Sequence, residues 1–453
     1  MTHNVTSEQL FGKTFACECG KTHRIEPREV LFESGAAEKV PALCARSVKG
    51  RRPAAGERSA AGQAVAVVMD VRTRDVAGAE VSRRLASGGW TVSELLVPDR
   101  SNGHVPECDD ATQEKLAAVL GPVDLLLPVG SGVVTDLSRW LAEDRKLPFV
   151  SFATAASMNG YASSNAAPTI AGVKRVKWAH PPVALAADPA IIAAAPWEMT
   201  ASGLGDVLAK SVSTSDWRLN HLLFGDYYCA RSVNLIADIE PLYLEHPEEL
   251  KARSPRAIDA LFRALLLTGV AMTMAETSSP ASGGEHMMSH TLDMLSLRDG
   301  TEHDLHGRQV GVGTVLASEL YRRVLAVESP SAAEPALSPD ERFWGKLAGE
   351  MRQEYSAKAE RMRLAARKLA QPGEWDRIRA DLAPLTRPPE TIQGCLSRAG
   401  AASRAADIGI GKEQLLGVLL HSHEIRSRFT ILDLARLVGI MPKAAAEIVE
   451  QWA

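Results

Sequence analysis

Three residues far apart in this chain, one carboxylate and two imidazoles, have the chemistry of a catalytic metal site. Asp206 follows Gly-Leu-Gly, His286 follows Ser-Gly-Gly-Glu, and His306 stands directly before a glycine. Such a ligand set leaves a position for water or substrate, and the metal then acts as a Lewis acid on a carbonyl or an alkoxide. His290 and His303 are close in sequence, and spacing alone leaves either of them open as the second or third ligand.

A second chemical signal lies where a predicted buried strand meets a predicted helix. The apolar run 123–129 leads into Gly130-Ser131-Gly132, and an amphipathic segment follows. A glycine turn at this place lets backbone N–H groups approach a pyrophosphate at the positive end of a helix. Asp70 ends an earlier apolar run, where a ribose hydroxyl is often held, although a lone aspartate there is more often a loop residue. Together these features predict a dinucleotide site.

The elements that carry these residues divide the chain into two regions. Between 63 and about 195, strand patterns alternate with helical ones: strands at 64–69, 91–97, 123–129 and 148–153, and helices near 76–88, 110–120 and 133–144. Alternation with short links predicts a parallel sheet covered by helices, with ligands beyond the carboxyl ends of its strands. After Pro196 a helical period continues almost without interruption.

The predicted fold is therefore α/β. A Rossmann-like, cofactor-binding parallel-sheet domain occupies residues 1–195, and an all-helical domain that binds metal and substrate occupies residues 196–453. The active site is expected in the cleft between them, because two-domain enzymes usually do their chemistry there. Segments 13–16 and 24–25 predict an opening hairpin, 47–62 predicts a loose connection, and 172–178 predicts an edge hairpin.

A group of possible metal ligands lies within the predicted opening hairpin. Cys17, Cys19 and His23 surround a glycine turn, which is a known setting for zinc. A closed zinc site needs four ligands, and only three are in sight, so we predict a plain hairpin here. The six cysteines of the chain are scattered and form no disulfide framework, so they are expected to be reduced.

Composition is that of a soluble globular protein. The 453 residues are 45 % hydrophobic and 23 % charged, which is enough for two hydrophobic cores. A net charge of −4 exerts no general attraction on nucleic acid or membranes. The first residues lack the basic start and apolar stretch of a signal peptide, and no long apolar run appears. We expect a cytoplasmic protein with no nucleic-acid partner and no membrane insertion.

In these motifs the chain resembles the sn-glycerol-1-phosphate dehydrogenases, in the superfamily of iron-containing alcohol dehydrogenases, glycerol dehydrogenase and dehydroquinate synthase. The similarity runs from about Asp70 to the segment 426–435 and covers most of the chain. Its most specific pieces are Gly130-Ser131-Gly132 with Asp136, the segment 149–163, Gly205-Asp206, the segment 282–286 and His306-Gly307.

The resemblance implies both the cofactors and their ligands. Asp206, His286 and His306 would hold one divalent metal, and zinc, nickel and iron all suit that set. NAD or NADP would be lined by the glycine turn, together with Asp136, Thr154 and Ser157. The implied reaction is reduction of a small ketone, with dihydroxyacetone phosphate and sn-glycerol 1-phosphate as the leading pair. A homodimer is the expected assembly.

Two departures from the family leave the substrate open. Asn159 stands where the family usually has an aspartate that faces the substrate hydroxyls, and His180-Pro181-Pro182 replaces Lys-Ala-Pro at a possible phosphate contact. The alternatives are a dehydrogenase of an unphosphorylated polyol or other small alcohol, and a sugar-phosphate cyclase of the dehydroquinate synthase type. Lys174, Arg175 and Lys177 would supply the basic groups that a cyclase needs.

A different class of protein stays as a distant alternative. Segments 432–440 and 444–449 have the helix, glycine turn and second helix of a DNA-binding helix-turn-helix. The second helix has only Lys443 as a base and no polar row for base edges, so a packed pair of helices is favoured.

Overall fold

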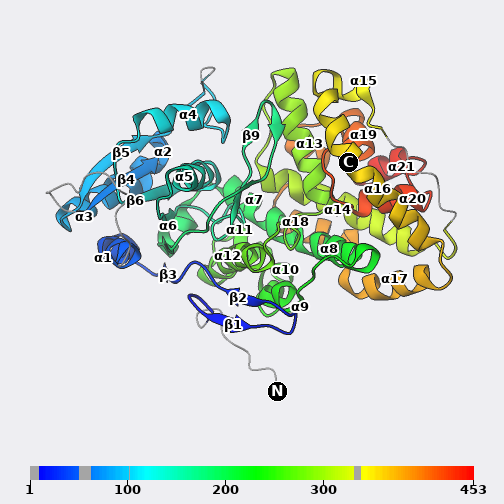
Figure 1. The fold of residues 1–453 in the computed structure, drawn as a ribbon, viewed down its shortest axis with the longest axis horizontal. Coiled ribbons are helices and arrows are strands. Elements are labelled where there is room, and N and C mark those ends of the chain that lie inside the picture. Colours follow the sequence, from blue (N-terminus) through cyan, green and yellow to red (C-terminus); the bar gives the residue numbers. More distant parts are fainter. Residues whose placement is uncertain (1–9, 50–62, 101–102, 331–337) are drawn as a thin grey trace.

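The structure, a computed structural model, describes residues 10–49, 63–100, 103–330 and 338–453. Its sheet region and its helical region lie side by side, the sheet toward the left of Figure 1 and the helices toward the right. Most of the loose connection predicted at 47–62 lies outside the described residues. The order of elements is that of an α/β protein with a helical carboxyl-terminal region, as predicted.

A six-stranded parallel sheet forms the first region. Its strands run in the order β3 (Glu29–Phe32), β12 (Ala184–Ala187), β7 (Val150–Ala153), β6 (Leu125–Gly130), β4 (Ala64–Met69) and β5 (Thr91–Leu96). The central strands β6 and β7 are buried along their whole length, as apolar strands of a parallel sheet covered on both faces must be.

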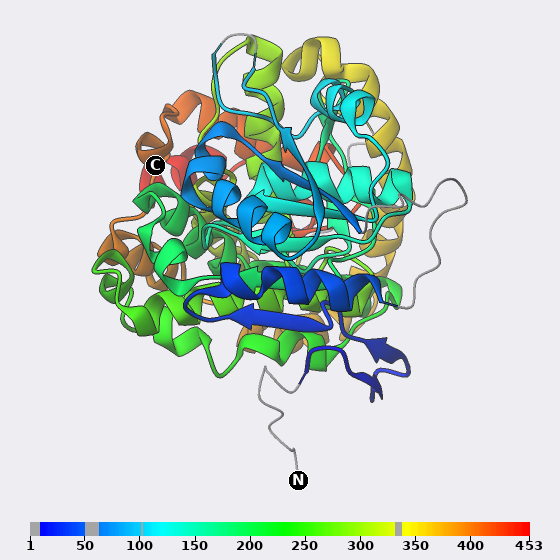
Figure 2. The ribbon, with the colours of Figure 1, turned by 90° about the vertical axis from the view of Figure 1, so that its left-hand side faces the viewer.

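Helices cover both faces of this sheet, and alternate residues of β4 contact different helix layers. Val65 and Val67 pack with α1 (Ala36–Val48) and α3 (Ala79–Ser87), whereas Ala66 and Val68 pack with α4 (Asp110–Val119) and α5 (Gly132–Arg145). Between β4 and α3 lie the short helix α2 (Val71–Thr73) and a π-helical segment, Arg74–Gly78. Figure 2 views the molecule from this sheet end.

The sheet differs from the sequence prediction at its far edge. The four predicted strands are confirmed, but β12 and β3 were missed, because β12 reads Ala-Leu-Ala-Ala and β3 is short and only half-buried. The edge hairpin predicted at 172–178 is wrong. Instead β10 (Val173–Lys174) pairs with β9 (Thr169–Ile170), and β11 (Lys177–Trp178) pairs with β8 (Asn165–Ala166), in two small separate sheets.

The opening hairpin is confirmed, and it packs against the helical region. Strands β1 (Thr14–Ala16) and β2 (Thr22–Arg24) pair antiparallel, with Phe15 opposite His23. Cys17 and Cys19, in the turn, pack with Trp217 and Cys229 of the helical region. The chain start therefore contacts residues that are some two hundred positions away in sequence.

In the described residues after Pro196, every regular element is a helix. The central helix α14 (His306–Leu325) packs on α7 (Trp197–Leu208), α13 (Gly284–Asp299), α18 (Pro389–Ala399) and α20 (Ile431–Leu437). The remaining helices are α6 (Pro189–Ala194), α8 (Lys210–Phe224), α9 (Ala230–Val233), α10 (Glu240–Leu244), α11 (Glu248–Lys251), α12 (Pro255–Ala275), α15 (Glu341–Trp344), α16 (Ala348–Leu369), α17 (Glu374–Leu382), α19 (Lys412–His421) and α21 (Ala445–Trp452).

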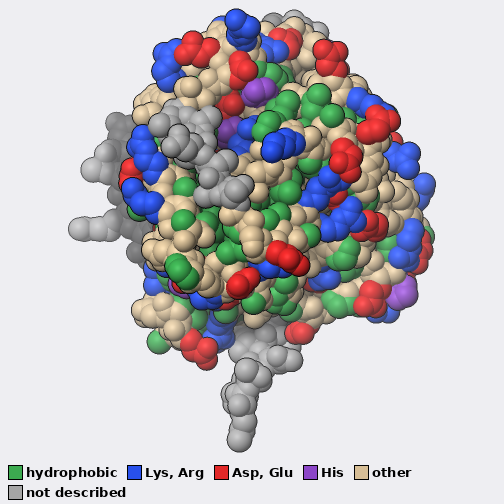
Figure 3. Space-filling model, turned by 90° about the vertical axis from the view of Figure 1, so that its right-hand side faces the viewer, with side chains coloured by type: hydrophobic (Ala, Val, Ile, Leu, Met, Phe, Trp, Pro, Cys, Tyr) green, Lys and Arg blue, Asp and Glu red, His purple; other side chains and the backbone are tan. Residues whose placement is uncertain are grey.

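One helix, α12, is long and apolar enough to cross a membrane by length and composition. In the structure, 83 % of its most apolar 18-residue segment is buried inside the protein, as expected for a core helix. Helix α21 is likewise packed, with Ile448, Val449 and Trp452 buried. Acidic and basic side chains are interspersed over the helical face seen in Figure 3. That face offers no broad basic surface of the kind that binds nucleic acid.

Candidate active site

The structure brings Asp206, His286 and His306 together from three helices. Asp206 lies on α7, His286 in the first turn of α13, and His306 at the first residue of α14. Their ligand atoms all lie within 4.8 Å of one another. The 3.4 Å between Asp206 Oδ1 and His286 Nε2 suits two ligands of one ion, each bound at about 2.0–2.2 Å. The residues present therefore fit a divalent metal.

Direct contact between two helix backbones produces this grouping. A Cβ atom on Gly205 would collide with the carbonyl oxygen of Gly307, and one on Gly307 would collide with the carbonyl oxygen of Ser202. Only glycine permits α7 and α14 to approach so closely. Asp206 and His306, each next to one of these glycines, are thereby placed beside one another.

Hydrogen bonds orient both imidazoles. The Nδ1 atom of His286 bonds Glu285 Oε1 at 2.7 Å, which directs its Nε2 atom toward Asp206. The Nδ1 atom of His306 bonds Ser289 Oγ at 3.1 Å. Neither Glu285 nor Ser289 was predicted from the sequence, and only the position of Glu285 directly before His286 hinted at its role.

The charges of the two imidazoles differ when no metal is bound. Burial disfavours the His286 cation, but hydrogen bonds to Asp206 and Glu285 outweigh burial and raise the pKa of His286 to about 9. Burial, followed by the charge of His286, lowers the pKa of His306 to about 4. The pocket thus stabilises one positive charge between its ligands, which is where a bound cation would sit.

Asn159 lies directly against Asp206. Its backbone N–H donates to Asp206 Oδ2 at 2.7 Å, and its side-chain Nδ2 donates to Oδ1 at 2.9 Å. Both residues are buried. The amide that departs from the family pattern therefore contacts the carboxylate of the candidate ligand set, a partner that its sequence position did not predict.

The alternative ligands occupy a neighbouring position. His290, Asp293 and His306 also have ligand atoms within 4.8 Å of one another, and the His290 and His306 rings stack at 5.4 Å. His290 therefore stays a possible ligand. His303 belongs to neither group, although its Nδ1 atom lies 3.3 Å from Asp293 Oδ1.

The predicted cofactor residues follow the carboxyl ends of three adjacent strands. Asp70 follows β4, Ser131 and Gly132 follow β6, and Thr154 follows β7. The chain passes from β4 to β5 on one side and then to β6 on the other, so the glycine turn lies at the topological switch point. Open parallel sheets bind their ligands at this point.

The glycine turn itself leaves room for a ligand. A Cβ atom on Gly132 would meet only Met158 Cγ, at an ordinary 3.7 Å. The hydroxyls of Ser131 and Ser157 bond one another beside the turn, and Thr154 N donates to Gly130 O at 3.2 Å. The start of α5 is thus open to a pyrophosphate.

Two carboxylates of the predicted cofactor set already have partners within the protein. Asp70 caps α2 and accepts a hydrogen bond from Thr73 N at 2.7 Å. Asp136 accepts from Arg139 Nη1 at 2.5 Å and from Ala167 N at 3.1 Å. Their contact with a cofactor stays a prediction.

Ser202 links the cofactor side of the site to the metal side. Its hydroxyl donates to Ser157 O at 3.1 Å and accepts from Gly307 N at 3.1 Å. The loop after β7 is therefore tied both to α7 and to the first turn of α14. Residues expected to hold a dinucleotide and residues expected to hold a metal thus belong to one connected site.

Two cations lie near the histidines: Lys174, which the sequence suggested only for the cyclase alternative, and Arg426, to which it assigned no role. Lys174 Nζ is 3.7 Å from Asp293 Oδ2, and the positive charge of Arg426 helps to lower the pKa of His290, after burial and His306. Within the described part of the chain, Arg426 forms no hydrogen bond or ion pair. His180, which stands where the family has a possible phosphate contact, packs on Phe149 at the opposite end of β7 from Thr154.

Comparison with known proteins shows which proteins this chain is similar to. A family model described as iron-containing alcohol dehydrogenase matches residues 49–196. Glycerol-1-phosphate dehydrogenase (NAD(P)+) of Geobacillus thermodenitrificans (strain NG80-2) is 31 % identical over 369 residues, 81 % of this chain and 85 % of that protein. The protein of the same name from Bacillus subtilis (strain 168) is 29 % identical over 368 residues, 81 % of this chain and 84 % of that protein.

Solved structures share the fold. Glycerol dehydrogenase from Schizosaccharomyces pombe superposes with a TM-score of 0.59 at 14 % identity, over 94 % of this chain and 90 % of that one. A 1,3-propanediol oxidoreductase superposes with a TM-score of 0.59 at 16 % identity, over 95 % of this chain and all of the other. At these identities the likeness concerns the architecture alone.

Proposed function

Because this chain belongs to the glycerol-1-phosphate dehydrogenase family of iron-containing alcohol dehydrogenases, we propose that it interconverts dihydroxyacetone phosphate and sn-glycerol 1-phosphate. It is a metal-dependent NAD(P) oxidoreductase. The observation that carries the proposal is the meeting of Asp206, His286 and His306 beside the loop that leads from the sheet.

We assign the binding of the metal and the binding of the cofactor to different residues. Asp206, His286 and His306 would hold the divalent metal, and the turn at Gly130 to Gly132 would hold the pyrophosphate of NAD(P). When bound, the metal supplies Lewis-acid polarisation of a carbonyl, and the nicotinamide supplies or accepts hydride. Asn159 keeps both oxygens of Asp206 in place through its two hydrogen bonds.

Positive charge near the histidines favours a phosphorylated substrate. Burial lowers the pKa of Arg426 to about 10, so the group is still a cation at neutral pH, and it has no anionic partner within hydrogen-bonding distance among the described residues. Lys174, 13 % exposed at its side chain, lies on another element next to Asp293. A phosphate would supply the missing anion, and an unphosphorylated polyol would not.

The cyclase alternative receives less support. Of the three basic residues that it would use, Arg175 pairs with Glu350 and Glu354, and Lys177 pairs with Asp144 at 3.2 Å. Of these three basic residues, only Lys174 lies near His290 and His306. These ion pairs reduce the basic groups available to a phosphorylated sugar acid.

A substrate panel tests the proposal. The metal-reconstituted protein is assayed with phosphorylated and free C3–C6 ketones and with both NADH and NADPH. We expect the highest kcat/KM with dihydroxyacetone phosphate, and Arg426→Gln should lower its advantage over free dihydroxyacetone by at least about tenfold. A wild-type preference for free dihydroxyacetone would replace the proposed function with the polyol dehydrogenase alternative. Release of phosphate from a sugar acid phosphate, with no net consumption of NADH or NADPH, would replace it with the cyclase alternative.

The finer properties belong to the same proposal. We place the domain boundary at residues 195 and 196, where α6 gives way to α7, and the resident metal is zinc, nickel or iron. The enzyme is proposed to act in the cytoplasm as a homodimer. Metal analysis of the purified protein checks the identity of the metal, and sedimentation of the native protein checks the homodimer.

A further inference from the structure

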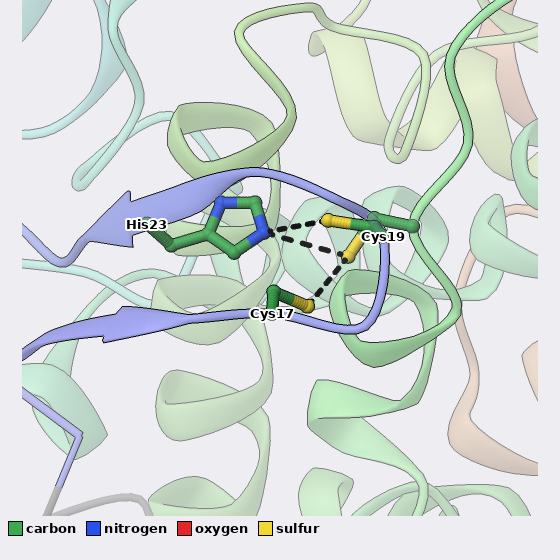
Figure 4. A group of neighbouring side chains, drawn as sticks. Cys17, Cys19 and His23 are labelled. Carbon is green, nitrogen blue, oxygen red and sulfur yellow. Dashed lines mark hydrogen bonds between the residues drawn. The ribbon is translucent and has the colours of Figure 1, made fainter.

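A second group of metal-ligating side chains shares no residue with the candidate active site. The ligand atoms of Cys17, Cys19, His23 and Cys229 all lie within 4.8 Å of one another. Figure 4 shows the imidazole of His23 and the sulfurs of Cys17 and Cys19 converging at the end of the β1–β2 hairpin. Cys229, the residue before α9, supplies the fourth side chain from the helical region. The sequence displayed only the three hairpin residues, and the fold completes the set.

The separations match those expected between ligands of one tetrahedral zinc ion. With Zn–S near 2.3 Å and Zn–N near 2.0–2.1 Å, tetrahedral ligands lie about 3.8 Å apart for two sulfurs and about 3.5 Å apart for sulfur and nitrogen. Cys17 Sγ and Cys229 Sγ are 3.8 Å apart. His23 Nε2 lies 3.2 Å from Cys19 Sγ and 3.7 Å from Cys229 Sγ.

The surroundings are those of a closed structural site. His23 and Cys229 are buried, and Cys17 and Cys19 are half-buried. Tyr227 Oη lies 3.1 Å from Cys19 Sγ. The backbone N–H of Ser232 donates to Cys229 Sγ at 3.4 Å. Hydrogen bonds of this kind orient the ligands of a metal and stabilise thiolates.

The hairpin is short, so a bound metal would add to the packing of Phe15 and Ile25 on the main hydrophobic core. Each strand has three residues, and isolated two-stranded hairpins are marginal in water. Its other links to the helical region include the exposed ion pair of Lys21 and Glu276 and the stacking of Arg231 on Phe15. Exposed ion pairs contribute little to stability, whereas a structural zinc site contributes much of the folding energy of a small element.

We propose that Cys17, Cys19, His23 and Cys229 bind a zinc ion in a closed, structural site that fastens the amino-terminal hairpin to the helical region. The site is separate from the candidate active site and does not depend on the proposed reaction. With four protein ligands it leaves no position for substrate.

Cobalt substitution of the full-length protein tests the proposal directly. Thiolate ligands give Co²⁺ a near-ultraviolet sulfur-to-cobalt charge-transfer band, and a site of one carboxylate and two imidazoles has no sulfur to give one. We expect the band in the wild type and in Asp206→Asn, and its loss in Cys229→Ser. Cys44→Ala, which removes a buried cysteine of the sheet region, is the matched control and should keep the band.

Metal content gives a second readout. Zinc-loaded wild type should hold about two ions per chain, and Asp206→Asn and Cys229→Ser should each hold about one. A wild type without the charge-transfer band, or a Cys229→Ser variant that keeps it, would overturn the proposal.

Thiol protection settles the question if Cys229→Ser does not fold. In the metal-free wild type the half-buried Cys17 and Cys19 should react with a thiol reagent, and stoichiometric zinc should block that reaction. Thiols that react equally fast with and without zinc would also contradict the site.

Discussion

Asn159 donates two hydrogen bonds to Asp206, one to each oxygen of its carboxylate, at 2.7 and 2.9 Å. The residue that departs from the family pattern is thus a direct partner of a candidate metal ligand. An amide can donate to a carboxylate, which a second ionised carboxylate cannot do. The substitution therefore changes the electrostatics of the ligand set as well as the face presented to a substrate.

Asn159→Asp should make the fold depend on the metal. The change replaces the 2.9 Å hydrogen bond with two carboxylates in contact, which repel one another unless a cation lies between them. We expect the chelator-treated variant to melt about 2–4 °C below the chelator-treated wild type, and the gap to narrow when metal is added. Thermal unfolding with and without metal measures the effect. Asn159→Ala, which adds no charge, should show no such metal dependence, and a similar dependence in both variants would contradict the explanation.

His306→Ala should remove the active-site metal while the fold survives, because this side chain belongs to a site and not to the hydrophobic core. Loss of a residue that merely orients a ligand costs about 10–100-fold in metal affinity, so loss of the ligand itself should exceed about 100-fold. Metal analysis, turnover and circular dichroism provide the measurement. His303→Ala, which lies outside the ligand group, should retain metal and turnover, and an active His306→Ala with its normal metal would remove that residue from the site.

Gly132→Val should weaken cofactor binding selectively. A Cβ atom at this position meets only Met158 within 4 Å, so the principal effect of the valine should be to block the approach of a pyrophosphate. We expect KM for NAD(P)H to rise at least about tenfold and KM for the ketone to change by less than about twofold. Gly130→Ala is the contrasting variant, because its Cβ would lie 2.7 Å from Val134 Cβ and should lower thermal stability instead. Equal rises in both KM values for Gly132→Val would indicate a distorted fold.

Glu424→Gln should reduce stability at neutral pH and matter less in acid. Burial disfavours the Glu424 carboxylate, but hydrogen bonds with His421, His423 and Trp344 outweigh burial and lower its pKa from 4.5 to about 2. Because the folded-state pKa lies below the unfolded one, the stabilisation is present above about pH 4.5 and is lost as the pH falls toward 2.

Urea unfolding at two pH values measures this effect. The difference in unfolding free energy between wild type and Glu424→Gln should shrink by roughly 2 kcal/mol between neutral pH and pH near 3. The exposed Glu413 supplies the control, and Glu413→Gln should show a small difference that does not change with pH. A difference for Glu424→Gln that is constant with pH would assign it to packing.

Much of this architecture follows from local sequence patterns. The apolar run at 64–69 and the run leading into Gly130 predicted strands of one parallel sheet, because buried strands need continuous apolar side chains. The glycines beside Asp206 and His306 were singled out only as motif residues, and the structure shows that they let α7 approach α14.

What local patterns did not predict depends on long-range contacts. Strand β12 is mostly alanine, and only its neighbours β7 and β3 make it a strand. Cys229 is separated from Cys17 by 212 residues, so no local spacing joins them. Ser289, the partner of His306, becomes visible only when α13 and α14 lie together, whereas Glu285 stands next to its partner His286 in the sequence.

The position of the β1–β2 hairpin has a consequence for the order in which the protein is assembled. At about 5–20 residues per second of synthesis, the 212-residue separation means that Cys229 is made on the order of ten to forty seconds after Cys17. Strand β3 likewise cannot pair until β12, its neighbour in the described sheet, has been synthesised. The β1–β2 hairpin can therefore reach its final place only after α7 and α8 have been made.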